Sequence, residues 1–373
     1  MIPFNDLNAH HENNRAKFHD ALDLLLDSSG FIGGQSVLNF EKAFSEFCNA
    51  KYSIGVGNGT DAIYLALKCL GIGPGDSVVT VPNTFIATTE AITMTGADII
   101  FIDVEAEERL IDLNALTNCL NTHPQKEKIK CVIPVHLFGQ PVDMISLKKI
   151  CDEKNIPIIA DSAQAHGTEI NGESITQYAD LSTFSFYPGK NLGALGDGGA
   201  VVTDNKKYSE FLHKCLNHGR SAKYDHEFEG INSRLDALQA LFLNIKLENL
   251  AEKTRSRQHF ARLYNEQLND LCPQIKLPKY IEGRLSAFHL YVIEVENRDE
   301  VQTKLDEHEI QTGIHYPIPL HRLKAYEYLN IKEGAFPVAE KLSKNILSLP
   351  LYPEMAEEDV ETVVQTLKSI LKG

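Results

Sequence analysis

Short runs of β-branched residues alternate with helix-like stretches through the first two-thirds of this chain, and that alternation limits the folds open to it. The runs that predict strands are 53–57, 77–81, 98–102, 131–135, 156–160, 181–186 and 200–203. Helical patterns lie between several of them, at 61–70, 87–95, 145–154 and 206–217. Strands separated by helices usually pair in parallel, with helices packed on both faces of the sheet. The sequence therefore predicts an α/β fold built on a mostly parallel central sheet.

The pattern changes after about residue 235, where long charged amphipathic helices cover 236–271 and a Pro-bearing α+β tail follows. A chain of 373 residues that is 43% hydrophobic is long enough for two cores, at roughly 150 residues per domain. We expect a large domain at 1–250 and a smaller α+β domain at 251–373. The helical pattern at 8–26 could pack against either of them.

Charge and cysteine usage limit the classes of partner. A formal net charge of −15 disfavours a nucleic-acid backbone, which binds clustered lysine and arginine. An anionic small molecule stays open, because a helix amino terminus can bind it. The seven cysteines form no C-x-x-C pair, which predicts reduced, mostly buried thiols. With no signal-like start and no apolar run near ~20 residues, the sequence predicts a cytoplasmic protein without a membrane span.

One lysine lies in surroundings that favour a chemical role. Lys190 is held between an apolar strand pattern and a glycine-rich turn, in the stretch Ser-Phe-Tyr-Pro-Gly-Lys-Asn-Leu-Gly at 185–193. An amine among apolar and small residues can lose its proton and condense with an aldehyde, as pyridoxal phosphate requires. Lys190 is therefore the candidate reagent of the chain.

Other positions suit the same cofactor. Gly59 and Thr60 follow the first predicted strand at the start of a helix, where free backbone N–H groups can bind phosphate. The third glycine of G-x-G-x-x-G is missing, which disfavours a dinucleotide site. Asp161 ends the apolar run 156–160, so its carboxylate could pair with a protonated pyridine nitrogen. Two further candidates at strand ends are Gln164, in a polar cluster, and Phe85, which could stack on a flat ring.

Taken together, these segments resemble the fold-type I pyridoxal-phosphate enzymes, and specifically the sugar aminotransferases of the DegT/DnrJ/EryC1/StrS family. The motifs that carry the resemblance are Gly-Thr-Asp at 59–61, Asp-Ser-Ala-Gln-Ala-His-Gly at 161–167 and Ser-Phe-Tyr-Pro-Gly-Lys at 185–190. Phe-Ile-Gly-Gly at 31–34, Phe-Glu at 40–41 and Gly-Ile-Asn-Ser-Arg-Leu-Asp at 230–236 extend it over nearly the whole chain. The resemblance implies the fold-type I architecture and pyridoxal 5′-phosphate as cofactor.

The resemblance also implies a role for each cofactor residue. Lys190 would bond to the cofactor aldehyde and, once freed, act as the base, while Asp161 would pair with the pyridine nitrogen. The other implied contacts are Gln164 beside the ring hydroxyl, Phe85 on the ring face, Gly59, Thr60 and Ser185 on the phosphate, and Asn232 on the phosphate of the neighbouring subunit. That last contact implies a homodimer with two shared sites.

In this family the amino group usually comes from L-glutamate and passes to a nucleotide-linked keto sugar by a ping-pong mechanism. Lys190 stands where family dehydratases carry histidine, so transamination is favoured. The segment 190–199 resembles the subgroup that aminates C3 of a nucleotide-linked sugar. Within that subgroup, the segment 223–230 and the pair at 315–316 resemble enzymes that act on a dTDP-3-keto-6-deoxyhexose. The product would be a dTDP-3-amino-3,6-dideoxyhexose of galactose or glucose configuration, used in deoxysugar biosynthesis for a lipopolysaccharide O-antigen or a glycosylated metabolite. The candidate sugar contacts are Tyr187, Tyr224, His315, Tyr316 and His321.

Alternatives stay open. A UDP-linked 3-keto-uronic acid carries an extra carboxylate, and Arg220 could supply the cation that it needs. A 4-keto nucleotide sugar is also open, although the chain departs from the Thr-Thr-Gly-Glu-Gly-Gly ending more typical of that subgroup. From another class, the chain could be a non-catalytic regulatory protein that binds pyridoxal phosphate. The presence of both Lys190 and Asp161 argues against that alternative.

Overall fold

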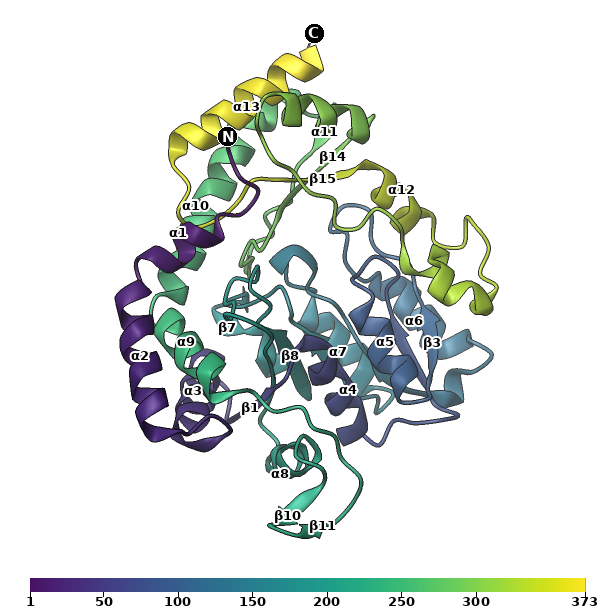
Figure 1. The fold of residues 1–373 in the computed structure, drawn as a ribbon. Coiled ribbons are helices and arrows are strands. Elements are labelled where there is room, and N and C mark those ends of the chain that lie inside the picture. The colour runs from purple at the N-terminus through teal and green to yellow at the C-terminus, as the bar shows by residue number, and fades with distance from the viewer. Residues whose placement is uncertain (373) are drawn as a thin grey trace.

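The computed structural model describes residues 1–372, and a central sheet with helices on both sides dominates it (Figure 1). One part of the sheet has the order β1-β9-β8-β5 and the other the order β3-β2-β4. Parallel bridges from Val132 to Ile158 and from Val135 to Asp161 join β4 to β5. The strands are β1 Tyr52–Val56, β2 Ser77–Thr80, β3 Asp98–Phe101, β4 Ile129–Val132, β5 Ile159–Asp161, β8 Leu181–Ser185 and β9 Gly199–Thr203.

Strand β9 runs antiparallel to both of its neighbours, whereas the other pairs in this sheet are parallel. The prediction of a mostly parallel sheet is confirmed. The bounds of two strands differ most from the prediction: β4 ends at Val132 instead of 135, and β5 begins two residues after Pro157 although the predicted run starts at 156. Proline has no N–H to donate to a ladder, so regular pairing starts after it.

Neighbouring residues on each strand face different layers of helices. Val78, Ile99 and Cys131 belong to a core under α4 Gly59–Cys69, α5 Ala87–Met94 and α8 Lys206–Cys215. Val79, Ile100 and Val132 belong to the core on the opposite face, under α6 Leu113–Thr122 and α7 Met144–Asp152. This period of two makes each strand apolar on both sides, as a covered sheet requires. A further core packs β8 and β9 against α3 Gly34–Phe47 and α9 Ala237–Leu247.

The carboxy-terminal part forms a second layer with its own core. Strand β14 Tyr291–Val295 pairs antiparallel with β12 Ile275–Lys276 and β15 Ile346–Leu349. Its apolar side chains pack on α10 Leu250–Leu268, α11 Arg298–Glu307 and α13 Glu357–Lys372. We propose a domain boundary near residue 250, between α9 and α10. Helix α12 Pro337–Asn345 instead packs on the core of the central sheet.

The amino-terminal helical pattern contacts both parts. It divides into α1 Leu7–Glu12 and α2 Arg15–Ser28. The Phe18 ring of α2 lies edge-on to Phe242 of α9, with ring centroids 5.0 Å apart. Ile2 is bridged to Ile310 and belongs to the core of the carboxy-terminal part. The first residues therefore run from α2 across to the carboxy-terminal part, as the purple chain of Figure 1 shows.

The remaining strands are short. They are β6 Glu169–Ile170, β7 Glu173–Ser174 and β13 Arg284–Leu285 in one small sheet, and β10 Arg220–Ala222 with β11 Asp225–His226 in an exposed hairpin. Short 3-10 helices occur at Lys126–Lys128, Leu137–Gly139, Ile175–Tyr178, Asn269–Leu271, Leu320–Arg322 and Lys324–Leu329. Within residues 1–372, no helix is long and apolar enough to cross a membrane.

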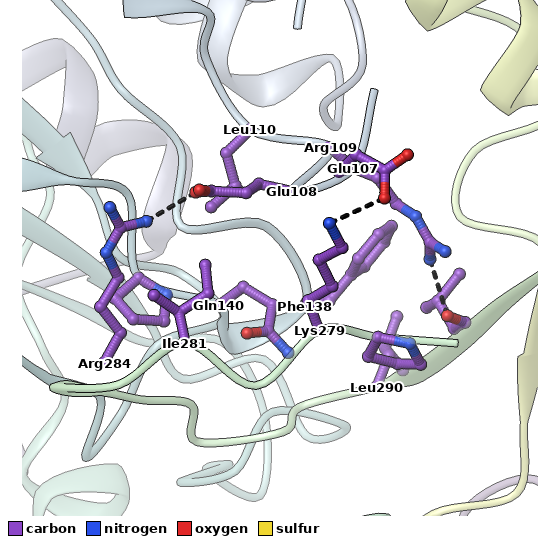
Figure 2. Close-up of a pocket in the computed structure, with 13 residues that line it drawn as sticks. Glu107, Glu108, Arg109, Leu110, Phe138, Gln140, Lys279, Ile281, Arg284 and Leu290 are labelled. Atoms are coloured by element: carbon purple, nitrogen blue, oxygen red, sulfur yellow. Dashed lines mark hydrogen bonds and ion pairs between the residues drawn. The ribbon is translucent and has the colours of Figure 1, made fainter. Parts of the chain in front are cut away.

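Ion pairs join the two parts around a small hollow of about 30 Å³ (Figure 2). The buried guanidinium of Arg109 donates to Glu294 at 3.1 Å and to the Val292 carbonyl at 2.7 Å. Arg284 pairs with Glu108 at 2.6 Å, and the exposed pair Lys279–Glu107 has a distance of 2.8 Å. Each charged group around this hollow already has a partner. The ion pairs around the hollow therefore connect the two parts, and the hollow is not a ligand site.

Candidate active site

A cavity of about 830 Å³ lies beyond the carboxyl ends of the central strands. Its wall includes residues that follow β1, β2, β5 and β8, because the carboxyl ends of parallel strands meet at one edge of a sheet. Of the predicted site residues, the lining contains Gly59, Thr60, Phe85, Asp161, Gln164, Ser185, Tyr187, Lys190, His315 and Tyr316.

Lys190 is placed by the loop that connects β8 to β9. Its backbone N–H donates to the Tyr187 carbonyl at 2.8 Å, and the following residues Leu192 and Ala194 are fully buried. A Cβ atom on Gly193 would lie 2.2 Å from the Pro188 carbonyl oxygen, so this tight loop needs glycine there. Burial lowers the pKa of the Lys190 amine to about 8, although the charge of Asp161 opposes the shift. A substantial fraction of the amine is therefore neutral near physiological pH.

Asp161, the last residue of β5, is a buried carboxylate. One of its oxygens accepts a hydrogen bond from the Thr88 hydroxyl at 2.8 Å, and the other accepts one from the Ala163 N–H at 3.2 Å. Burial raises its pKa, while these two hydrogen bonds and the charge of Lys190 oppose the change. Within residues 1–372 the carboxylate makes no ion pair, so it is available to a cationic group entering the cavity.

The first turn of α4 forms an anion cradle. Asn58 caps the helix by accepting a hydrogen bond from the Asp61 N–H at 2.8 Å. A Cβ atom on Gly59 would lie 2.7 Å from the Cβ of Ser185, so glycine leaves the backbone open between the two segments. Free N–H groups at a helix start bind phosphate well. The cradle, the buried carboxylate and the reactive amine together fit the phosphate, ring nitrogen and aldehyde of pyridoxal phosphate.

Gln164 has a fixed orientation in the cavity wall. Its side-chain oxygen accepts from the Phe138 N–H at 2.6 Å, and its nitrogen donates to the Tyr316 hydroxyl at 3.3 Å. The ring of Phe85 is 53% exposed, and its centroid lies 5.6 Å from that of Tyr316. An open phenyl face beside the cavity suits contact with a flat ring.

The predicted sugar contacts divide into two groups. His315 forms a hydrogen bond of 2.9 Å with the Ser348 hydroxyl and lies against the Phe4 ring. Burial lowers the pKa of His315 to about 4. Together with Tyr187 and Tyr316 it borders the cavity. By contrast, Tyr224 is 86% exposed in the β10–β11 hairpin, near the end of Figure 1 farthest from the termini. His321 is buried 3.0 Å from Glu340, and neither it nor Tyr224 lines this cavity.

Two residues predicted for the ligand's charged groups also lie outside the cavity of their own chain. Asn232 is exposed and forms a bridge with Asn217. Its neighbour Ser233 is buried and donates to Asp61 at 2.6 Å, which anchors the segment to the cradle helix. Arg220, considered for a uronic acid, is exposed on β10.

Sequence reasoning missed several residues of the wall, among them Phe4, Asn5, Thr88, Asp197 and His289. Thr88 could have been found, since it lies one helical turn after Phe85 at the start of a helix. Phe4 and His289 had no such signal, because their segments are distant in sequence from the central strands and only the tertiary fold brings them to the cavity.

Comparison with known proteins identifies the architecture. The model of the DegT/DnrJ/EryC1/StrS aminotransferase family matches residues 12–368. The chain is 39% identical to dTDP-3-amino-3,6-dideoxy-alpha-D-galactopyranose transaminase of Aneurinibacillus thermoaerophilus, over 98% of this chain and 99% of that protein. It is 38% identical to "Pleiotropic regulatory protein" of Geobacillus stearothermophilus, over 98% and 97%. It is 36% identical to a UDP-N-acetyl-3-dehydro-alpha-D-glucosamine 3-aminotransferase of Acidithiobacillus ferrooxidans, over 100% and 98%.

Solved structures agree with this result. DesV of S. venezuelae superposes with a TM-score of 0.96 at 36% identity, over 100% of this chain and 99% of that one. NtdA of Bacillus subtilis, solved with bound cofactor PMP, has a TM-score of 0.93 at 30% identity, over 100% and 85%. The predicted family and the predicted fold class are both confirmed.

Proposed function

Because the chain belongs to the DegT/DnrJ/EryC1/StrS aminotransferase family, we propose that it transfers an amino group from L-glutamate to C3 of a dTDP-3-keto-6-deoxyhexose in the cytoplasm. The protein is a nucleotide-sugar aminotransferase that uses pyridoxal 5′-phosphate. The product is a dTDP-3-amino-3,6-dideoxyhexose. One observation carries the proposal: a depressed-pKa lysine, a carboxylate that is buried without an ion-pair partner among residues 1–372, and an anion cradle share one cavity.

When bound, the cofactor supplies an aldehyde that bonds to amines and a ring that withdraws electrons from the carbon next to nitrogen. Asp161 would pair its carboxylate with the ring nitrogen, and the Thr88 and Ala163 hydrogen bonds hold that carboxylate in place. Gly59, Thr60 and Ser185 would hold the phosphate, and Gln164 would contact the ring hydroxyl. Phe85 would cover the ring face.

Lys190 carries the proton in each half-reaction. With a pKa of about 8, roughly a quarter of the amines are neutral at pH 7.5, against about one in a thousand for an ordinary lysine. A neutral amine can take a proton at one carbon and return it at another, which is general base and then general acid catalysis. Since amino donor and keto sugar would use the same cavity in turn, ping-pong kinetics follow.

The proposed site is shared between two subunits. Asn232 is exposed and outside the cavity of its own chain, while its neighbour Ser233 is anchored to the cradle helix through Asp61. The segment is fixed to the cradle helix at Ser233, and the preceding residue, Asn232, is exposed. Asn232 is therefore suited to contact a second chain. We therefore propose a homodimer in which Asn232 contacts the phosphate bound by the partner.

The acceptor sugar is the least constrained part of the proposal. The dTDP assignment is supported by the relative at 39% identity, whereas the relative at 36% identity keeps a UDP-linked acceptor as the second candidate. The exposed position of Arg220 gives no support within one chain to a uronic acid. The 38% relative bears a regulatory name, but the placement of both Lys190 and Asp161 in the cavity favours catalysis.

Absorption spectroscopy of the purified protein tests each step. Pyridoxal phosphate should give a visible band that L-glutamate bleaches and that dTDP-3-keto-6-deoxyhexose restores. Restoration by a UDP-linked sugar instead would replace the proposed acceptor. Lys190→Ala should keep a folded dimer without the band or turnover. If wild-type protein binds the cofactor but glutamate leaves the band unchanged, transamination from glutamate is refuted.

A further inference from the structure

His289 has one ring nitrogen in a hydrogen bond, and the other has no partner among residues 1–372. Its Nδ1 lies 3.1 Å from the side-chain oxygen of Asn191. The Asn191 amide nitrogen donates to the Ala287 carbonyl at 3.0 Å, which fixes the amide orientation. Since an amide oxygen only accepts, Nδ1 must carry the hydrogen, and Nε2 is left with a lone pair.

The backbone around His289 is held firmly. Arg257 is buried and donates to the carbonyls of His289 at 3.3 Å and of Leu351 at 2.8 Å. Gly139 packs so closely that a Cβ atom on it would lie 3.0 Å from the backbone nitrogen of His289. Held from both sides and through its Nδ1, the imidazole has little freedom to turn.

The free nitrogen of His289 has a natural partner in Lys190. Both residues border the cavity, and Asn191, which fixes the imidazole, is the next residue after Lys190. The Lys190 charge is the largest electrostatic influence on the His289 ring after burial, which lowers the pKa of His289 well below its usual value. Within residues 1–372, the Lys190 amine makes no hydrogen bond or ion pair, and His289 Nε2 makes no hydrogen bond.

We propose that His289 is a positioning residue whose Nε2 accepts a hydrogen bond from the Lys190 amine once that amine is released from the cofactor and its stem turns toward the imidazole. Lysine reaches such a partner easily, because its four-carbon stem is flexible. The contact would keep the released amine beside the reacting carbons between its two proton transfers. The inference rests on the proposed function for its role in turnover, but the contact itself does not.

The other charged and titratable groups near the pair do not offer the same acceptor. Asp161 accepts from Thr88 and Ala163, and the proposed function assigns its remaining lone pairs to the cofactor ring nitrogen. Arg257 is a cation and only donates. His166 and His315 are neutral, with pKa values lowered by burial to about 3 and about 4. His166 does not line the cavity that Lys190 and His289 border, and His315 is engaged by Ser348 at 2.9 Å.

Two substitutions separate the roles of the two ring nitrogens. In His289→Asn, the amide nitrogen can replace Nδ1 as donor to Asn191, but no atom occupies the Nε2 position. In His289→Gln, the longer side chain can put an acceptor near the Nε2 position. If Nε2 matters, Gln should rescue what Asn loses; if only the link to Asn191 matters, Asn should suffice and Gln should fail.

The first readout is the pH dependence of Lys190 acetylation by acetic anhydride in the full chain freed of cofactor, quantified by mass spectrometry. An acceptor on the lysine amine stabilises its protonated form, so His289→Asn should move the midpoint down by about one pH unit. His289→Gln should restore it. An unchanged midpoint in His289→Asn would overturn the proposal. Should that variant not fold, Asn191→Leu, which frees the tautomer, must also lower the midpoint.

The second readout is turnover with L-glutamate in the cofactor-loaded enzyme. His289→Asn should lower kcat at least tenfold with KM for glutamate nearly unchanged, because the lost contact positions a proton carrier rather than substrate. A rise in KM at constant kcat would contradict positioning. The acetylation result requires neither cofactor nor substrate, so it stands even if the proposed donor or acceptor proves wrong.

Discussion

Replacing Lys190 with methionine should stabilise the cofactor-free protein at neutral pH. Burial lowers the pKa of this amine from 10.5 to about 8, and a shift of that size corresponds to about 3 kcal/mol of preference for the neutral form. The value already includes the attraction to Asp161. Since the amine borders a cavity that water can enter, we expect about 2 kcal/mol to be measurable. Methionine keeps the length of the stem without the charge.

The pH dependence gives the sign of the effect. A lysine whose pKa is lower in the folded protein binds fewer protons there than in the unfolded chain, so stability rises with pH between the two values. The loss of stability caused by the charged amine is present in full below about pH 8. It decreases as the pH approaches the pKa of free lysine, ~10.4. The gain from Lys190→Met should therefore shrink across this interval.

Urea unfolding of the cofactor-free protein at pH 7 and pH 9.5 measures the difference. Lys190→Arg is the matched control, because arginine keeps its charge at both values and should bring no gain at either. If Lys190→Met is no more stable than wild type at pH 7, or gains equally at both pH values, the amine is not held at a cost in the folded protein.

Three other substitutions test separate parts of the structure. Gly59→Ala should weaken pyridoxal phosphate binding at least tenfold in a fluorescence titration, because its Cβ would lie 2.7 Å from the Ser185 Cβ; unchanged affinity would place the phosphate elsewhere. Asp161→Asn should lower kcat by about two to four orders of magnitude with the melting temperature of the loaded enzyme within a few degrees, and normal turnover would remove Asp161 from the reaction. Glu294→Ala should cost about 3–5 kcal/mol in urea unfolding, because it leaves the Arg109 guanidinium buried without its carboxylate; a loss below 1 kcal/mol would mean that this joint contributes little.

Local patterns were sufficient for the sheet. The runs of β2, β4 and β8 are buried on both faces except at Lys130 and the half-buried Ser185, and a strand of that kind must lie between two layers of helices. The parallel order then required the residues after those strands to meet at one edge. Lys190, Asp161 and Gly59 were therefore found from the sequence, since Asp161 ends a strand and the other two lie in the segments that follow strands.

Residues that reach the cavity from elsewhere could not be found in this way. Phe4 arrives because Ile2 joins the core of the carboxy-terminal part. His289 arrives because Arg257 and Gly139 hold its backbone against the central domain. Tyr224 and His321 looked similar to His315 in sequence, but one lies on an exposed hairpin and the other is buried beside Glu340.

The sequence by itself determined the sheet, the helix start that can bind phosphate and the lysine and aspartate that face it, because each depends on a few neighbouring residues and on the direction of a strand. Only the tertiary structure decided the proton affinity of Lys190, the tautomer of His289 and the membership of the cavity wall. Those properties depend on burial and on contacts between segments distant in the chain, and no local pattern encodes them.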